Sequence, residues 1–230
     1  MARDQEMIAA VQAGAVEKVR ELLDQERGLA AARDGAGVSA IMHALYRQRK
    51  DIVEMLAKAK PDLDIFEAAA LGNTTRVARL IEGDSASVNS YSADGFTALH
   101  LACFFSQPSA AKLLLERGAD PAAVAKNVTQ VTPLHSAASG RNMEAVRQLL
   151  AHGAPVNARQ QHGWTALHSA AQNGSEEMVD ALLKHGADVR AANEEGVTPA
   201  AVAEKAGHTR VAQSLRAKAG TEARHDTGSV

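Results

Sequence analysis

The chain has 230 residues, of which 46% are hydrophobic and 23% are charged, the composition of a folded protein rather than a disordered one. Its formal net charge is -2, so the chain does not have the excess of basic residues found in nucleic-acid-binding proteins. We therefore expect no nucleic-acid partner. No segment reaches the roughly 20 apolar residues of a membrane helix, and no membrane partner is expected. The single cysteine, Cys103, excludes an internal disulfide and, together with a charged N-terminal segment, favours a cytoplasmic protein.

One sequence pattern recurs along the chain, weakly at first and clearly from residue 97 onward. The clear copies follow one another at steps of 35, 33 and 33 residues, and the three weaker copies before them take steps of 34, 24 and 34. A repeat of this length is typical of a solenoid, in which each unit stacks on its neighbours. The seven predicted units begin near Gln5, Ser39, Leu63, Thr97, Thr132, Thr165 and Thr198.

Each unit is expected to contain two helices, as the clearest copy illustrates. Thr132 suits the N-cap of the first helix, where its hydroxyl accepts an otherwise unpaired backbone N–H, and Pro133 suits the next position. Leu134 opens an apolar stripe at helical spacing, and Val146 and Leu150 mark a second helix. Neither helix could bury its apolar stripe alone, so each unit depends on the next.

The step of 24 residues between the second and third units is the main irregularity. It is nine residues short of 33, and the segment 57–64, which includes Pro61, stands where a turn or hairpin should project. We therefore predict that the projecting finger between these two units is missing and that the concave side is notched there.

The last unit has the features of a cap. It places Glu204 and Arg216 where an inner unit has Ala171 and Leu183, and charged groups would be costly against a further repeat. The solenoid is expected to end near Lys218, which makes residues 1–218 a single domain. Residues 219–230 have little apolar content and are predicted to be a disordered C-terminal tail.

The residues from Thr132 to His135, with Ala137, resemble the signature of the ankyrin repeat, T-P-L-H-x-A. The units at Thr97 and Thr165 have alanine in place of proline, and the resemblance covers roughly residues 7–218. It implies an all-α ankyrin-repeat solenoid of about seven helix-turn-helix units, with short hairpin fingers and two capping units. It also implies a non-enzymatic module that binds a partner protein through its concave face and needs no cofactor.

The candidate chemical groups favour structural roles. His100, His135 and His168 share one phase of the repeat, and the resemblance implies that this histidine ties the turn to the helix by hydrogen bonds. Equivalent positions on helices about 8–10 Å apart do not easily share a zinc ion, so no metal site is predicted. Cys103 falls on the stripe of small residues and is expected to be a buried, inert thiol. No catalytic motif occurs, and we expect no enzyme activity.

The few aromatic residues are the main candidates for partner contact, because aromatic side chains are enriched at the centres of interfaces. Phe104 and Phe105 either contact the partner or fold inward to cover a turn that lacks the usual glycine. Phe96 and Trp164 either contact the partner or pack as spacers between fingers. The basic run at residues 46–50 either faces water or meets an acidic patch on a partner. The predicted partner-binding residues are Tyr46, Arg47, Tyr91, Phe96, Phe104, Phe105, Gln161, His162, Trp164, Gln172 and Asn173.

The repeat leaves the partner unidentified. The expected state is a monomer that binds another protein. Two alternatives stay open: a regulator or inhibitor that covers the site of a partner enzyme, and a self-associating structural scaffold.

Overall fold

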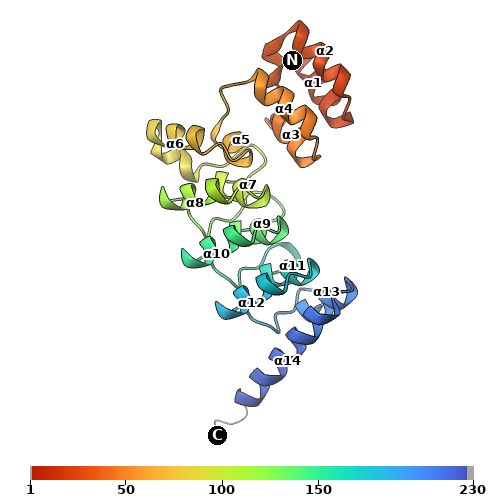
Figure 1. Cartoon of the computed structure of the whole chain (residues 1–230), viewed down its shortest axis with the longest axis vertical. Coiled ribbons are helices and arrows are strands. Elements are labelled where there is room, and N and C mark those ends of the chain that lie inside the picture. The colour runs from red at the N-terminus through yellow and green to blue at the C-terminus, as the bar shows by residue number, and fades with distance from the viewer. Residues whose placement is uncertain (1, 227–230) are drawn as a thin grey trace.

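The computed structural model describes the backbone of residues 2–226 and the side chains up to Thr221, and in this part of the chain it contains 14 α-helices and no strand. The helices form seven consecutive pairs that stack into an elongated solenoid, with the two termini at opposite ends (Figure 1). The predicted all-α ankyrin-type solenoid is therefore confirmed.

Two parallel rows of helices make up the stack. The first helices of the pairs form the inner row: α1 (Ala2–Ala13), α3 (Ala40–Tyr46), α5 (Ile65–Ala70), α7 (Ala98–Phe104), α9 (Pro133–Ser139), α11 (Ala166–Gln172) and α13 (Pro199–Lys205). The second helices form the outer row: α2 (Val16–Gln25), α4 (Lys50–Ala59), α6 (Thr74–Gly83), α8 (Pro108–Glu116), α10 (Met143–Ala151), α12 (Glu176–Lys184) and α14 (Thr209–Asp226).

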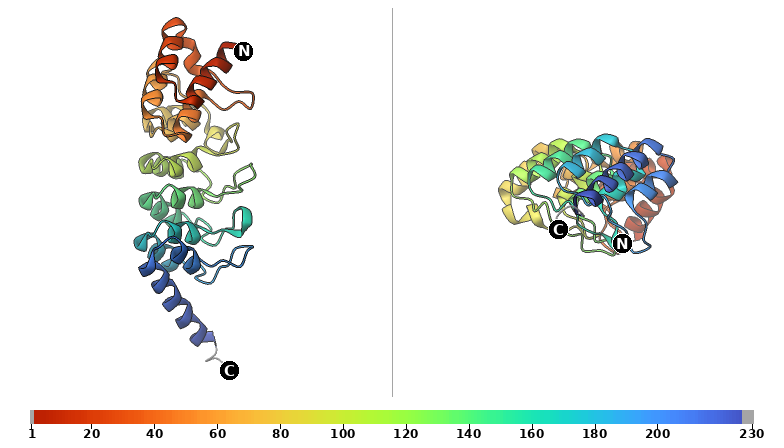
Figure 2. Two further views of the ribbon diagram at one scale, coloured as in Figure 1. Left: turned by 90° about the vertical axis from the view of Figure 1, so that its right-hand side faces the viewer. Right: turned by 90° about the horizontal axis from the view of Figure 1, so that it is seen from below.

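Loops between successive pairs project to one side of the stack as fingers (Figure 2). Short 3-10 turns occur in three of them: η1 (Arg27–Ala31), η2 (Ser85–Asn89) and η3 (Gln161–Gly163). Neighbouring fingers are joined by backbone hydrogen bonds, such as Lys126 N–H to the Gly95 carbonyl at 2.8 Å and Gln161 N–H to the Thr129 carbonyl at 3.0 Å. The fingers therefore form a continuous stacked edge rather than independent loops.

Small side chains allow the inner helices to approach one another closely. The buried residues of this row include Ala102, Cys103, Ala137, Ala138 and Ala171, all fully buried. Leucine and valine from the outer row complete one core that runs the length of the stack. This explains how a chain with 3% aromatic residues buries a continuous interior.

The predicted loss of a finger between the second and third units is confirmed. Helix α4 ends at Ala59 and α5 begins at Ile65, so only the extended segment 60–64 joins the two pairs. Helices α3 and α5 make fewer contacts than any other neighbouring pair of the inner row, and Figure 1 shows α1–α4 displaced from the stack that begins at α5.

The third unit also begins one residue later than its sequence pattern indicates. Asp64, not Leu63, is the N-cap of α5, and its carboxylate accepts from the N–H groups of Phe66 and Glu67. Helix α5 has six residues where α7 has seven. Glu67 thereby takes the position of the signature histidine, and its carboxylate pairs with the Lys60 ammonium at 2.6 Å in a buried setting.

At both ends of the chain, the observed helix extends beyond the boundary that the sequence predicts. Helix α1 begins at Ala2, so Gln5 lies inside it. Helix α14 continues to Asp226, so the disorder predicted for residues 219–230 is not seen in 219–226. The helix formers alanine, glutamate and arginine extend it there, and Arg190 donates a hydrogen bond to the Ala219 carbonyl. The rest of that prediction, residues 227–230, lies outside the described residues.

Candidate protein-interaction face

A threonine–histidine capping box fixes the inner row at three successive units. The hydroxyls of Thr97, Thr132 and Thr165 lie 2.7, 2.9 and 2.9 Å from Nδ1 of the histidine three residues later. The threonine backbone N–H also donates to the same Nδ1, at 3.1–3.2 Å. In these three units the histidine ring therefore provides an acceptor for the backbone N–H of the N-cap threonine.

The second ring nitrogen of each histidine joins one unit to the next. Nε2 of His100 lies 3.0 Å from the Val131 carbonyl, that of His135 lies 3.2 Å from the Trp164 carbonyl, and that of His168 lies 3.1 Å from the Val197 carbonyl. Because a carbonyl can only accept, Nε2 carries a proton, and because Nδ1 accepts from the threonine N–H, the ring is neutral. Desolvation by burial lowers the pKa of His100 and His135 to about 4 and also lowers the pKa of His168.

These bonds decide the role of the three histidines. Both ring nitrogens of each are engaged within the protein, so they are structural ties rather than metal ligands or acid–base catalysts. Burial likewise raises the pKa of the fully buried Cys103 thiol, which leaves it inert at neutral pH.

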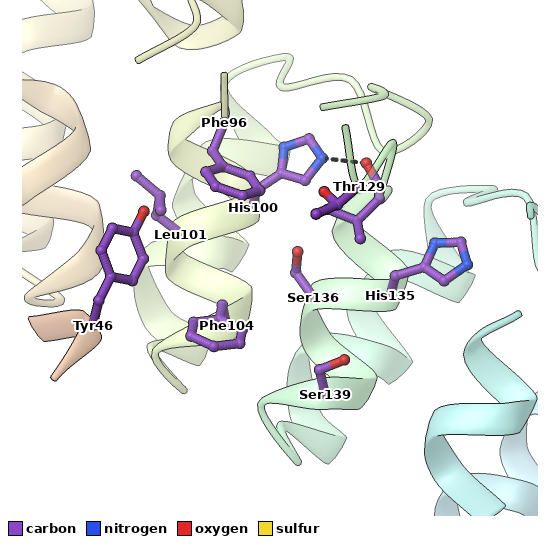
Figure 3. A pocket seen from close by; sticks show the side chains of 10 residues that line it. Tyr46, Phe96, His100, Leu101, Phe104, Thr129, His135, Ser136 and Ser139 are labelled. Atoms are coloured by element: carbon purple, nitrogen blue, oxygen red, sulfur yellow. Dashed lines mark hydrogen bonds between the residues drawn. The ribbon is translucent and has the colours of Figure 1, made fainter. Parts of the chain in front are cut away.

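An apolar pocket of about 190 Å³ opens between α7 and α9 on the inner row (Figure 3). It extends to Tyr46 at the end of α3 and to finger residues on both sides of α7. No carboxylate lines it. Its ten lining residues are Tyr46, Phe96, His100, Leu101, Phe104, Thr129, Val131, His135, Ser136 and Ser139. We call this cavity the α7/α9 pocket.

Tyr46 and Phe104, two residues that line the α7/α9 pocket, both pack on Phe105. Tyr46 packs on Phe105 at 5.6 Å between ring centroids, and Phe105 meets Phe104 edge to face at 5.1 Å. Phe104 stays 43% exposed, whereas Phe105 is half-buried beneath it. Phe104 therefore presents its ring to the surface, whereas Phe105 packs inward against the cluster of Met42, Ala70 and Leu101.

Three further predicted contact residues lie at the end of α3 and in the finger before α7. Arg47 is exposed directly after Tyr46. The Tyr91 hydroxyl donates to the Val124 carbonyl at 3.1 Å, and the Lys126 ammonium lies 4.1 Å from the centre of its ring. Phe96 packs against His100 at 6.0 Å between ring centroids.

Four of the other predicted residues lie toward the C-terminal end. Gln161 and His162 are exposed in η3, and a second pocket of about 370 Å³ between α11 and α13 includes Trp164 and Gln172 in its lining. Asn173 is instead committed to structure, because its side chain donates to the Ala138 carbonyl at 2.9 Å and accepts from Arg141 at 3.2 Å.

Sequence reasoning missed several lining residues of the α7/α9 pocket. Ser136 and Ser139 are ordinary helix residues in the sequence, and only the stacking of α9 on α7 brings them opposite Phe104. Thr129 belongs to a finger that the step of 35 residues makes two residues longer than its neighbours. The same finger carries Val128, which is 78% exposed. The longer step is the sequence feature that could have pointed to this finger.

Comparison with known proteins places the chain in a family. Residues 64–125 and 122–193 match the family model described as ankyrin repeats (3 copies). The matched region covers more than half of the chain, so the chain belongs to the ankyrin repeat family. Ankyrin repeats are generally protein–protein interaction modules, and the family is generally non-enzymatic.

Curated relatives match part of the chain at moderate identity. The chain is 35% identical over 135 residues to ankyrin repeat and SAM domain-containing protein 6 of Rattus norvegicus, covering 54% of this chain and 15% of that protein. It is 35% identical over 99 residues to BCL-6 corepressor-like protein 1 of Homo sapiens, covering 43% and 5%. It is 35% identical over 94 residues to a transient receptor potential cation channel subfamily A member 1 homolog of Caenorhabditis elegans, covering 41% and 8%.

The chain thus spans less than a sixth of the length of each of these relatives. Within the part of the chain that the structure describes, no helix combines the length and apolar character required to cross a membrane.

Proposed function

We propose that this chain binds a partner protein through its concave face and that the α7/α9 pocket is the centre of the contact. The observation that carries the proposal is the pocket itself, an apolar cavity of about 190 Å³ with an exposed aromatic ring, Phe104, at its mouth. Concave apolar sites with a few polar groups are the usual places where proteins bind ligands, and exposed apolar patches mark interaction surfaces.

The rigidity of the pocket wall supports this role. His100 and His135 are each held by bonds to both ring nitrogens, and the fingers that contribute Phe96 and Thr129 are joined by backbone hydrogen bonds. A surface that is ordered before the partner arrives loses little conformational entropy on docking. In this proposal the chain acts as a monomer in the cytoplasm and performs no chemistry of its own.

Affinity capture with matched variants tests the proposal. Ser139→Phe fills the mouth of the pocket from an exposed position on α9, and Ser109→Phe makes the same change at an exposed position on the outer helix α8. A native lysate is passed over the wild type and both variants, and the retained proteins are identified by mass spectrometry. We expect one protein to be retained by the wild type and Ser109→Phe but lost from Ser139→Phe. Equal retention by all three chains would contradict the proposal.

A further inference from the structure

The α7/α9 pocket has polar features that define its ligand more narrowly, and the following inference rests on the function proposed above. We propose that the pocket receives a tryptophan or tyrosine side chain from a partner segment rich in aspartate and glutamate. Three observations carry this: the size of the cavity, the serine hydroxyl that faces into it, and nearby cations that lack carboxylate partners.

The cavity is large enough for an aromatic ring. Its volume is about 190 Å³, and an apolar protein cavity of roughly 150 Å³ is known to take up benzene. The walls are mainly aromatic and aliphatic side chains, including Phe96, Leu101 and Phe104. His100 and His135 add no charge, because burial lowers the pKa of each to about 4. The cavity therefore offers an uncharged slot to a ring at neutral pH.

The Ser136 hydroxyl favours a ring that carries a polar atom. Ser136 is only 6% exposed, and Figure 3 shows its hydroxyl directed from α9 into the space beside α7. The hydrogen bonds of the described chain include none from this hydroxyl. A ring that enters the cavity displaces the water available to this hydroxyl, and an indole N–H or a phenol O–H would replace that hydrogen bond. Phenylalanine would fill the same volume and leave the hydroxyl unpaired.

Two arginines lie close in the chain to residues that line the pocket. Arg47 follows Tyr46 at the end of α3, and Arg141 lies two residues beyond Ser139 at the end of α9. Arg47 approaches only the His43 ring, and Arg141 donates to the Asn173 amide. Neither pairs with a carboxylate in the described part of the chain, whereas Arg147 pairs with both Glu144 and Glu177.

One carboxylate, that of Asp94, lies on the same side and offsets part of this positive charge. The Asp94 carboxylate accepts hydrogen bonds from Tyr46 at 2.6 Å and from Ser92 at 2.5 Å. Lys126, on the finger that also supplies Thr129 to the pocket, lies over the Tyr91 ring and adds a third cation on this side. Complementary charge on a partner would therefore be negative, as the basic run at residues 46–50 also indicates.

Selection from an unbiased peptide library tests this ligand class. A library of random peptides displayed on phage is selected on the full-length wild-type chain and, in parallel, on Ser139→Phe and Ser109→Phe. We expect the wild type and Ser109→Phe to enrich peptides with a tryptophan or tyrosine flanked by aspartate or glutamate. We expect Ser139→Phe to enrich none of these peptides.

Titration of one enriched peptide then tests each element of the site. Ser136→Ala should remove the preference of the site for the selected peptide over its phenylalanine analogue. Arg47→Gln and Arg141→Gln should each weaken binding about two- to fivefold, the range of exposed ion pairs, and should reduce its sensitivity to salt. Arg79→Gln, at an exposed position on the outer helix α6, is the control. It should leave the affinity for the peptide and the salt dependence of that affinity unchanged.

The outcomes separate this inference from the proposed function. The inference would be overturned if the peptides required an open pocket but carried no acidic residues. It would also be overturned if they bound Arg47→Gln and Arg141→Gln as tightly as the wild type. Either result would leave the proposed function in place. Enrichment that is identical on the wild type and Ser139→Phe would overturn both. A dimer in sedimentation equilibrium that Ser139→Phe abolishes would also overturn the inference, because a second copy of the chain would then occupy the pocket.

Discussion

The hydroxyl of Tyr46 donates a hydrogen bond of 2.6 Å to the carboxylate of Asp94, although the two residues are 48 positions apart and the helices α4, α5 and α6 lie between them in sequence. The contact is possible because the second unit lacks its finger. With no finger between α4 and α5, the finger before α3 meets the finger before α7, where a Cβ atom on Gly37 would lie 3.1 Å from that of Ala93. Tyr46 thus joins the N-terminal four helices to the rest of the stack.

Removing the Tyr46 hydroxyl should loosen this junction. Tyr46→Phe keeps the ring packed on Phe105 but takes one donor from the Asp94 carboxylate. Because hydrogen bonds to charged groups contribute about 1.5–3 kcal/mol, we expect the free energy of unfolding to fall by that amount in urea denaturation. Tyr91→Phe removes a more exposed hydroxyl bound to a neutral carbonyl and should cost less. A loss for Tyr46→Phe no larger than that for Tyr91→Phe would contradict this account of the junction.

The ion pair between Lys60 and Glu67 should be strongly coupled. Lys60→Met leaves the fully buried Glu67 carboxylate without its cation, and we expect a loss of about 3–5 kcal/mol, typical of a broken buried pair. The double variant with Glu67→Gln removes both charges and keeps an acceptor for the Asp64 N–H, so it should recover most of the loss. A double-mutant cycle by urea denaturation measures the coupling, and strictly additive losses would show that the pair does not act as a unit.

The buried histidines should make the stability depend on pH. The pKa of His100 and of His135 is about 4 in the folded chain, against an ordinary value of about 6.5 when the chain is unfolded. The unfolded state therefore binds more protons between these values, so the stabilisation is present above about pH 6.5 and is lost as the pH falls toward 4. Each pKa unit corresponds to about 1.4 kcal/mol per histidine. Denaturation across this range should show a smaller pH slope for His135→Asn, and an unchanged slope would count against a neutral, buried His135.

The stacked fingers should not tolerate a side chain at Gly95. Its φ is +85°, and a Cβ there would lie 2.7 Å from the Lys126 carbonyl oxygen. Gly196, with φ of +74°, has no atom within 4 Å of the same position. Alanine at either site strains the backbone by about 1 kcal/mol, but only Gly95→Ala also displaces the next finger. We expect thermal denaturation to show a distinctly larger loss for Gly95→Ala, and similar losses would show that the fingers are not stacked closely.

The sequence alone predicts the repeat and most of its architecture, because the N-cap residues, the apolar stripes and the terminal charges are local features. It also predicts the missing finger, since a step of 24 residues has no room for one. The later start of α5 was missed because Asp64 and Glu67 form a capping box that does not use the usual threonine and histidine.

The candidate site was predicted less completely than the fold. Tyr46, Phe96 and Phe104 can be picked out from the sequence because they are aromatic residues outside the positions that pack the core of each unit. Ser136 and Thr129 acquire their significance only from the way α9 and a longer finger stack on α7, which no single segment encodes. The ends of helices are equally non-local, as the continuation of α14 to Asp226 illustrates.

The central claim is that the concave face binds a partner at the α7/α9 pocket, and the affinity of Phe104→Ala for the captured partner tests it most directly. Phe104 is 43% exposed, so its truncation should leave the melting temperature within a few degrees of the wild type. Isothermal titration calorimetry should show a dissociation constant at least about tenfold weaker, because an aromatic side chain at the centre of an interface commonly contributes over about 2 kcal/mol. Equal affinities of the two chains, with the variant folded, would contradict the claim.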